Sequence, residues 1–83
     1  MSELVGGPFH KLRQTAQIIG AARKAKKSGL LVKGMTPDEV QDVIVAQLLG
    51  DDPKTYGDPK FDLASLIALI IELLPIIMAL FGL

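Results

Sequence analysis

Residues 63–83 read LASLIALIIELLPIIMALFGL, and this stretch decides how the rest of the chain can fold. Leu, Ile and Phe make up twelve of its first 20 residues, among which Glu72 is the one charged side chain and Pro75 the one proline. A helix of 20 residues rises about 30 Å, which matches the hydrocarbon core of a bilayer. The sequence therefore predicts an apolar C-terminal helix over residues 63–82 and favours a transmembrane one.

The energy of insertion favours the membrane only modestly. Twelve Leu, Ile and Phe side chains contribute about −5 kcal/mol in total, against about +3 kcal/mol for one charge near the centre. Pro75 cannot donate a hydrogen bond to the carbonyl of Ile71, so a kink is expected there. The alternative is a helix buried in the core of a soluble oligomer.

Apart from Ala64, the residues of this helix that are not bulky hydrophobes recur at intervals of 3, 4, 3, 4 and 3. We call this stripe the seam, and it consists of Ser65, Ala68, Glu72, Pro75, Ala79 and Gly82. Small residues along one line allow helices to approach closely in lipid, where hydrophobicity gives no drive for association. Glu72 in the seam would face protein or water rather than lipid. The seam predicts a helix-packing face.

The formal net charge of zero conceals a division along the chain. Seven Lys or Arg and no acid lie between residues 4 and 35, whereas seven acids and two Lys lie between residues 36 and 62. The basic segment suits anionic lipid headgroups or a nucleic-acid backbone. The candidate contacts are Lys11, Arg13, Arg23, Lys24, Lys26, Lys27 and Lys33. Alternatively, the acidic segment of the same or a neighbouring chain neutralises them.

The basic segment is predicted to form an amphipathic helix over residues 8–28. Pro8 suits a first helical turn, and Gly29 suits the position after the last one. An apolar stripe is expected at Phe9, Leu12, Ala16 and Ile19. Residues 1–7 are expected to form a flexible lead.

A short acidic helix is predicted over residues 37–49, ending before Gly50. Thr36 and Glu39 have the spacing of a capping box, with Pro37 at the first helical position. Met35 and Val40 are spaced to form a hydrophobic staple. The expected apolar stripe is Val40, Val43, Ile44 and Leu48.

Residues 51–62 form the predicted linker, in which Asp-Pro-Lys occurs twice. Two X-Pro steps favour an extended, stiff conformation. Asp62 is a candidate N-cap for the apolar helix. The predicted organisation is thus all-α, with a two-helix amphipathic region over residues 8–50 and a hydrophobic anchor over residues 63–83.

The sequence contains no motif for catalysis or for cofactor binding. With no Cys and one His, it lacks thiolates and a histidine ligand set. The acids of the linker lack the alternating order of a calcium loop, and no glycine-rich phosphate loop is present. We expect no enzyme activity, no cofactor, no metal and no small-molecule substrate.

All nine Lys and Arg precede the apolar segment. The positive-inside rule then predicts a membrane protein whose N-terminal part stays on the cytoplasmic side, or inside an enveloped particle. We expect a small tail-anchored protein with a structural or assembly role that oligomerises or docks through its C-terminal helix. A minor membrane protein of a virus particle and an accessory subunit of a membrane complex both fit, with the bilayer and a homo-oligomer or larger assembly as partners. The alternatives are a holin-like pore-former and a soluble all-α scaffold subunit.

Overall fold

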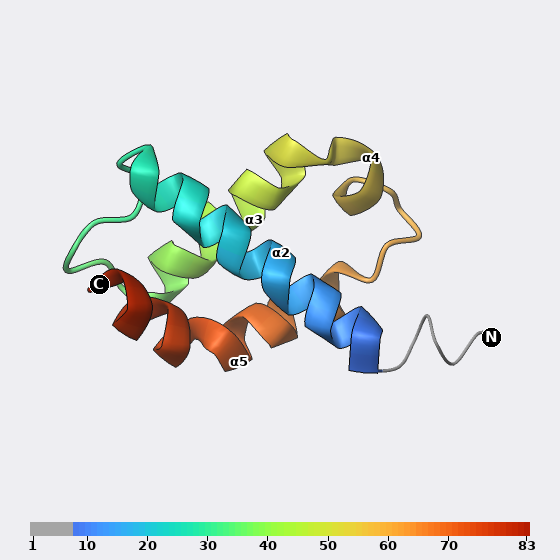
Figure 1. The fold of residues 1–83 in the computed structure, drawn as a ribbon. Coiled ribbons are helices and arrows are strands. Elements are labelled where there is room, and N and C mark those ends of the chain that lie inside the picture. Colours follow the sequence, from blue (N-terminus) through green and yellow to red (C-terminus); the bar gives the residue numbers. More distant parts are fainter. Residues whose placement is uncertain (1–7) are drawn as a thin grey trace.

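The computed structural model describes residues 8–83, and every regular element in this range is an α-helix. The elements are α2 (Pro8–Lys27), α3 (Pro37–Asp51), α4 (Pro53–Tyr56) and α5 (Leu63–Phe81). The three long helices pack around one core, and α4 continues the chain beyond α3 (Figure 1). The all-α prediction is confirmed. The predicted flexible lead lies outside the described residues.

The first and last long helices end on glycines in the left-handed conformation. At the end of α2, Gly29 has a φ of +79°, and the Leu30 N–H donates to the carbonyl of Ala25 at 2.9 Å. Gly82 has a φ of +67° at the end of α5. Glycine adopts this conformation without the steric cost that other residues incur, which fixes both helix ends.

Side-chain caps fix where α3 and α5 begin. The Thr36 N–H donates to Glu39 Oε1 at 2.9 Å, and the Glu39 N–H donates to Thr36 Oγ1 at 3.2 Å, so the predicted capping box is confirmed. Asp62 caps α5 by accepting from the Ser65 N–H at 3.1 Å. Helix α3 runs on to Asp51, two residues beyond its predicted end.

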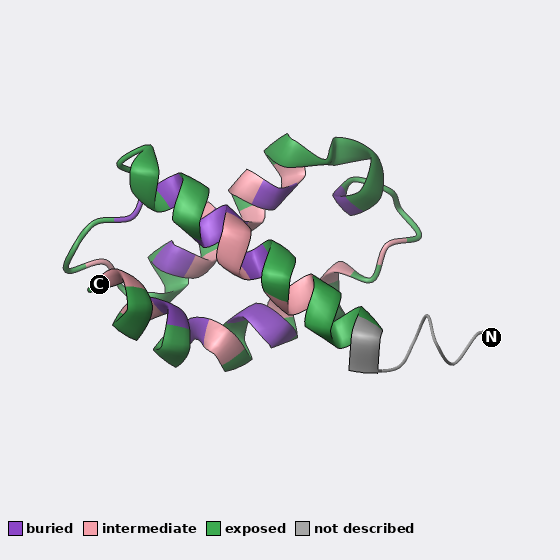
Figure 2. Ribbon diagram, in the orientation of Figure 1, coloured by how far each residue is buried: buried purple, intermediate pink, exposed green. Residues whose placement is uncertain are grey.

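The core lies between α2, α3 and α5. Helix α3 buries Val40, Ile44 and Leu48, which belong to its predicted stripe. Helix α5 buries more side chains than α3 does, namely Leu66, Leu69, Ile70, Leu74 and Ile77. Figure 2 shows buried segments along each of the three long helices. The largest apolar contribution to the core therefore comes from α5.

The predicted apolar stripe of α2 is wrong. Leu12 is 69 % exposed, Ala16 is exposed and Ile19 is only partly buried, while the side chain of Phe9 lies outside the described part. The residues that α2 buries are Ile18, Ala21, Ala22 and Ala25. Alanine methyl groups allow the neighbouring helices to approach α2 closely, so packing selects the alanine face over the side with the larger leucine.

The predicted extended linker is also wrong, because residues 53–56 form a helical turn. Asp52 caps this turn by accepting from the Thr55 N–H at 3.2 Å. Tyr56 is buried, and its hydroxyl donates to Gln17 Oε1 at 2.6 Å. The Phe61 ring packs edge-on against the Tyr56 ring, with 5.1 Å between the centroids. This aromatic pair holds the segment against α2.

Replacing a fully buried side chain should measure how far the core stabilises the fold. Ile44 is 0 % exposed, so Ile44→Ala is expected to lower the free energy of unfolding by about 2–4 kcal/mol. The control Leu12→Ala removes an exposed side chain and should change it by less than about 0.5 kcal/mol. Urea denaturation followed by circular dichroism measures both, and equal losses would contradict the assigned core.

The capping box predicts a specific pH dependence. Hydrogen bonds from the Thr36 backbone and hydroxyl groups hold the pKa of Glu39 below its ordinary value of 4.5. The ionised form is therefore favoured by folding, and its contribution is present above that value and lost as the pH falls through the lowered pKa. The stability difference between wild type and Glu39→Gln should be largest near neutral pH and shrink in acid. A difference that stays constant in denaturation experiments across this range would contradict the cap.

Candidate membrane and assembly surface

Helix α5 presents two faces of different character. Successive residues lie 100° apart around a helix, which places the buried Leu66, Ile70 and Ile77 on one side. All six seam residues lie on the other side, and all are exposed: Ser65, Ala68, Glu72, Pro75, Ala79 and Gly82. Figure 2 shows the exposed side of α5 turned away from the bundle. The seam is thus free of the described core, and its role in helix packing stays a prediction.

Large apolar side chains flank the seam on both sides. Ile71, Ile76 and Leu80 are each more than half exposed. Helix α5 is long and apolar enough to cross a membrane. Within its most apolar stretch of 18 residues, only 28 % are buried. Exposed apolar surface of this extent is typical of sites that contact lipid or protein. The described helices α2 and α3 therefore leave about half of the circumference of α5 without cover.

Glu72 lies in the middle of the exposed face, beside a cation from α2. Lys11 Nζ is 3.9 Å from Glu72 Oε1, and both side chains are largely exposed. An exposed ion pair of this kind stabilises a fold by at most about 1 kcal/mol. Helix α5 continues without interruption through Pro75, and the expected kink stays a prediction. The two charges line a shallow groove between α2 and α5, together with Gln14, Ser65, Ala68 and Leu69.

The basic residues divide into paired and unpaired groups. Lys11 pairs with Glu72, and Lys24 Nζ lies 3.1 Å from Asp51 Oδ2 on α3. The other candidate contacts are exposed and have no acidic partner within residues 8–83: Arg13, Arg23, Lys26, Lys27 and Lys33. Neutralisation of the basic segment by α3 is therefore limited to the Lys24–Asp51 pair in the described chain. Within residues 8–83, these five cations therefore have no acidic group that neutralises them.

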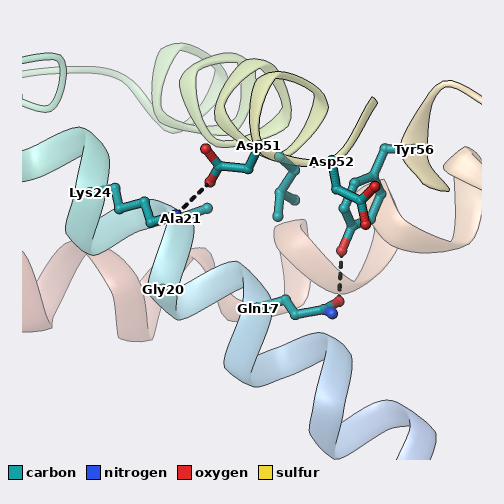
Figure 3. A pocket seen from close by; sticks show the side chains of 8 residues that line it. Gln17, Gly20, Ala21, Lys24, Asp51, Asp52 and Tyr56 are labelled. Atoms are coloured by element: carbon teal, nitrogen blue, oxygen red, sulfur yellow. Dashed lines mark hydrogen bonds and ion pairs between the residues drawn. The ribbon is translucent and has the colours of Figure 1, made fainter. Parts of the chain in front are cut away.

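A pocket of about 250 Å³ lies between α2, α3 and α4. Figure 3 shows the Lys24–Asp51 ion pair on one side of it and the hydrogen bond from Tyr56 to Gln17 on the other. Burial, followed by the nearby Asp52 carboxylate, raises the pKa of Tyr56. Four polar side chains of this pocket pair with one another, Lys24 with Asp51 and Tyr56 with Gln17, which is typical of a structural contact. Residues 8–83 contain no cluster of His, Asp or Glu that could hold a metal ion.

Sequence reasoning missed one exposed apolar site in the loop between α2 and α3. Leu31 is 1 % exposed and reaches the core, whereas its neighbours Leu30 and Val32 are 53 % and 51 % exposed. The signal was present as three consecutive apolar residues between Gly29 and Gly34. The chain bends at Leu31, and this side chain turns into the core while those of its two neighbours stay about half exposed.

Comparison with family models, with curated proteins and with solved structures finds no match to this chain. A functional proposal therefore depends on the chemistry of the surfaces described above. Those surfaces are the exposed apolar face of α5 and the unpaired cations of α2 and of the loop that follows it.

Enlarging one seam residue should separate packing from insertion. Ala68→Leu adds bulk to the seam while keeping α5 apolar, so it is expected to abolish most chemical crosslinking between copies in vesicles without reducing membrane binding. The control Ala16→Leu makes the same change at an exposed position of α2. Equal crosslinking yields from the two variants would contradict the assignment of the seam as a packing face.

Proposed function

We propose that this chain is a small tail-anchored membrane protein with a structural or assembly role, and that α5 is both its anchor and its docking element. The observation that carries the proposal is the exposed face of α5, where Ile71, Ile76 and Leu80 flank the seam. Such a face is unfavourable in water, and either lipid or a second helix would cover it. A minor membrane protein of a virus particle or an accessory subunit of a membrane complex would use a helix of this kind.

Spanning a bilayer requires α5 to leave the other two long helices. The charged side chains of α2 and α3 cannot follow it into hydrocarbon without a large cost in free energy. The core-facing side of α5, with Leu66, Ile70 and Ile77, would exchange protein neighbours for lipid tails of similar polarity. The bilayer and the apolar core of the helix bundle therefore compete for the same side chains of α5.

The distribution of charge supports one orientation. All nine Lys and Arg precede α5, so the segment that contains them is expected to remain on the cytoplasmic side or in the interior of a particle. The C-terminal end of α5 would cross. The seam would then lie within the bilayer, where small residues allow copies of α5 to approach one another.

A second candidate function is that of a soluble assembly subunit. The observation in its favour is that Leu66, Ile70 and Ile77 of α5 are already buried in the core that α5 forms with α2 and α3. Sister chains would then cover the exposed face of α5 in place of lipid. This candidate predicts a discrete oligomer in detergent-free buffer, whereas the membrane proposal predicts stable association with vesicles.

Resistance to alkaline carbonate extraction tests the membrane proposal. The wild-type chain, synthesised in the presence of vesicles, is expected to remain in the membrane pellet. Ile76 is exposed, so Ile76→Lys should fold normally in water but add about 3 kcal/mol to the cost of insertion. That variant should move largely into the carbonate supernatant.

A matched control makes the extraction experiment specific to α5. Leu12→Lys introduces the same charge at an exposed apolar position of α2 and should leave extraction unchanged. If carbonate removes the wild-type chain completely, the membrane proposal is wrong. If Leu12→Lys and Ile76→Lys are extracted to the same extent, the membrane contact does not depend on α5.

A further inference from the structure

The loop between α2 and α3 has a defined shape that projects two apolar side chains. The buried Leu31 anchors the middle of the loop, and Leu30 and Val32 are exposed on either side of it. Glycines in the left-handed region flank the segment, Gly29 with a φ of +79° and Gly34 with a φ of +95°. These constraints position the loop, and Leu30 also lines a groove with Val43 and Ala46 of α3. Both Leu30 and Val32 remain about half exposed.

Lysines flank the two exposed apolar residues of this loop in the sequence. Lys26 and Lys27 precede them in the last turn of α2, and Lys33 follows them. All three are exposed and lack an acidic partner in the described chain. We call this group the basic tip, and it consists of Lys26, Lys27, Leu30, Val32 and Lys33.

The acids nearest in sequence to the basic tip belong to the first turn of α3. They are Asp38 and Glu39, and both complement the positive end of the helix dipole. The Glu39 carboxylate also accepts a hydrogen bond from the Thr36 N–H. Both acids therefore have a structural role at the helix start, and the lysines of the basic tip form no ion pair with them.

We propose that the basic tip docks the folded chain on an anionic lipid surface. Lysines beside a bilayer that contains anionic lipid gain from its negative surface potential, and aliphatic side chains between them gain by entering the interface. A nucleic-acid backbone would interact favourably with the lysines but would give no favourable contact to Leu30 and Val32, so lipid is the better match. This inference deepens the proposed membrane function and rests on it.

Docking at the basic tip would place the correct end of α5 against the membrane. Figure 1 shows the loop between α2 and α3 and the C-terminal end of α5 at the same end of the molecule, with the N-terminal end of α2 at the other. Leu80, close to the end of α5, is 63 % exposed. The proposed orientation requires this end to cross first, so docking precedes and directs insertion.

The charge contribution is tested by the initial rate of association with vesicles. Energy transfer from Tyr56, the one tyrosine, to a dansyl-labelled lipid reports the rate in a stopped-flow instrument. The rate for vesicles of phosphatidylcholine and phosphatidylserine should fall about tenfold in the double variant Lys26→Gln/Lys27→Gln, because electrostatic steering is lost. Added salt should also reduce the wild-type rate, because it screens the attraction between the lysines and the anionic lipid.

The matched control removes two lysines at a distance from the basic tip. Lys54 and Lys60 are exposed and lie in and after α4, so Lys54→Gln/Lys60→Gln makes the same change in net charge. This variant should associate at close to the wild-type rate. Equal rates for the two double variants, or equal wild-type rates with and without phosphatidylserine, would overturn the proposal.

The apolar contribution has its own pair of variants. Val32→Asn removes an exposed apolar side chain from the basic tip. Leu12→Asn removes an exposed apolar side chain from the N-terminal half of α2. The dissociation rate of the docked chain should rise about fivefold for Val32→Asn only. Equal dissociation rates for both variants would overturn the role of the loop.

Failure of this inference can be distinguished from failure of the proposed membrane function. If the wild-type chain resists carbonate but associates equally fast with neutral and anionic vesicles, docking at the basic tip is wrong and the anchor stands. If association depends on phosphatidylserine and on Lys26 and Lys27 but carbonate removes all the protein, the anchor is wrong and docking stands.

Discussion

A helix that is apolar around nearly its whole circumference sets the constraint on which the rest of this fold depends. One side of α5 supplies five buried residues to the core, yet Ile71, Ile76 and Leu80 remain more than half exposed on the other. Helices α2 and α3 pack against one side of α5 and cannot surround it completely. The other half of α5 is therefore left uncovered by the described residues.

The other helices are adapted to this constraint. Helix α2 buries a face made of Ile18 and alanines, which allows close approach, and it keeps most of its lysines and arginines in water. Tyr56 and Phe61 fold the connection to α5 against α2 instead of leaving it extended. In water, the bundle is thus a small core that shields one side of α5. A membrane would compete with that core for the buried apolar residues of α5.

Local chemistry made part of this structure predictable from sequence. The Thr36–Glu39 capping box and the cap at Asp62 depend on residues three apart, so short motifs identified them. The buried face of α2 depends on which neighbour packs against it, and a pattern that weights large apolar residues selected the exposed Leu12 instead. For the candidate surface, spacing placed the six seam residues on one face of α5, and the structure shows that this face is exposed. Its role in helix packing stays a prediction. The exposed Leu30 and Val32 were missed because their exposure depends on Leu31 reaching the core.

Hydrogen exchange of the backbone amides, with and without vesicles, tests most directly whether the core and the membrane compete for α5. If the two compete, amides around Ile70 in α5 should remain protected in vesicles, because lipid excludes water from the helix. Amides around Ile44 in α3 should lose protection when vesicles are added, because α5 no longer covers them. Unchanged protection of both helices would show that α5 stays in the bundle, and would contradict the account.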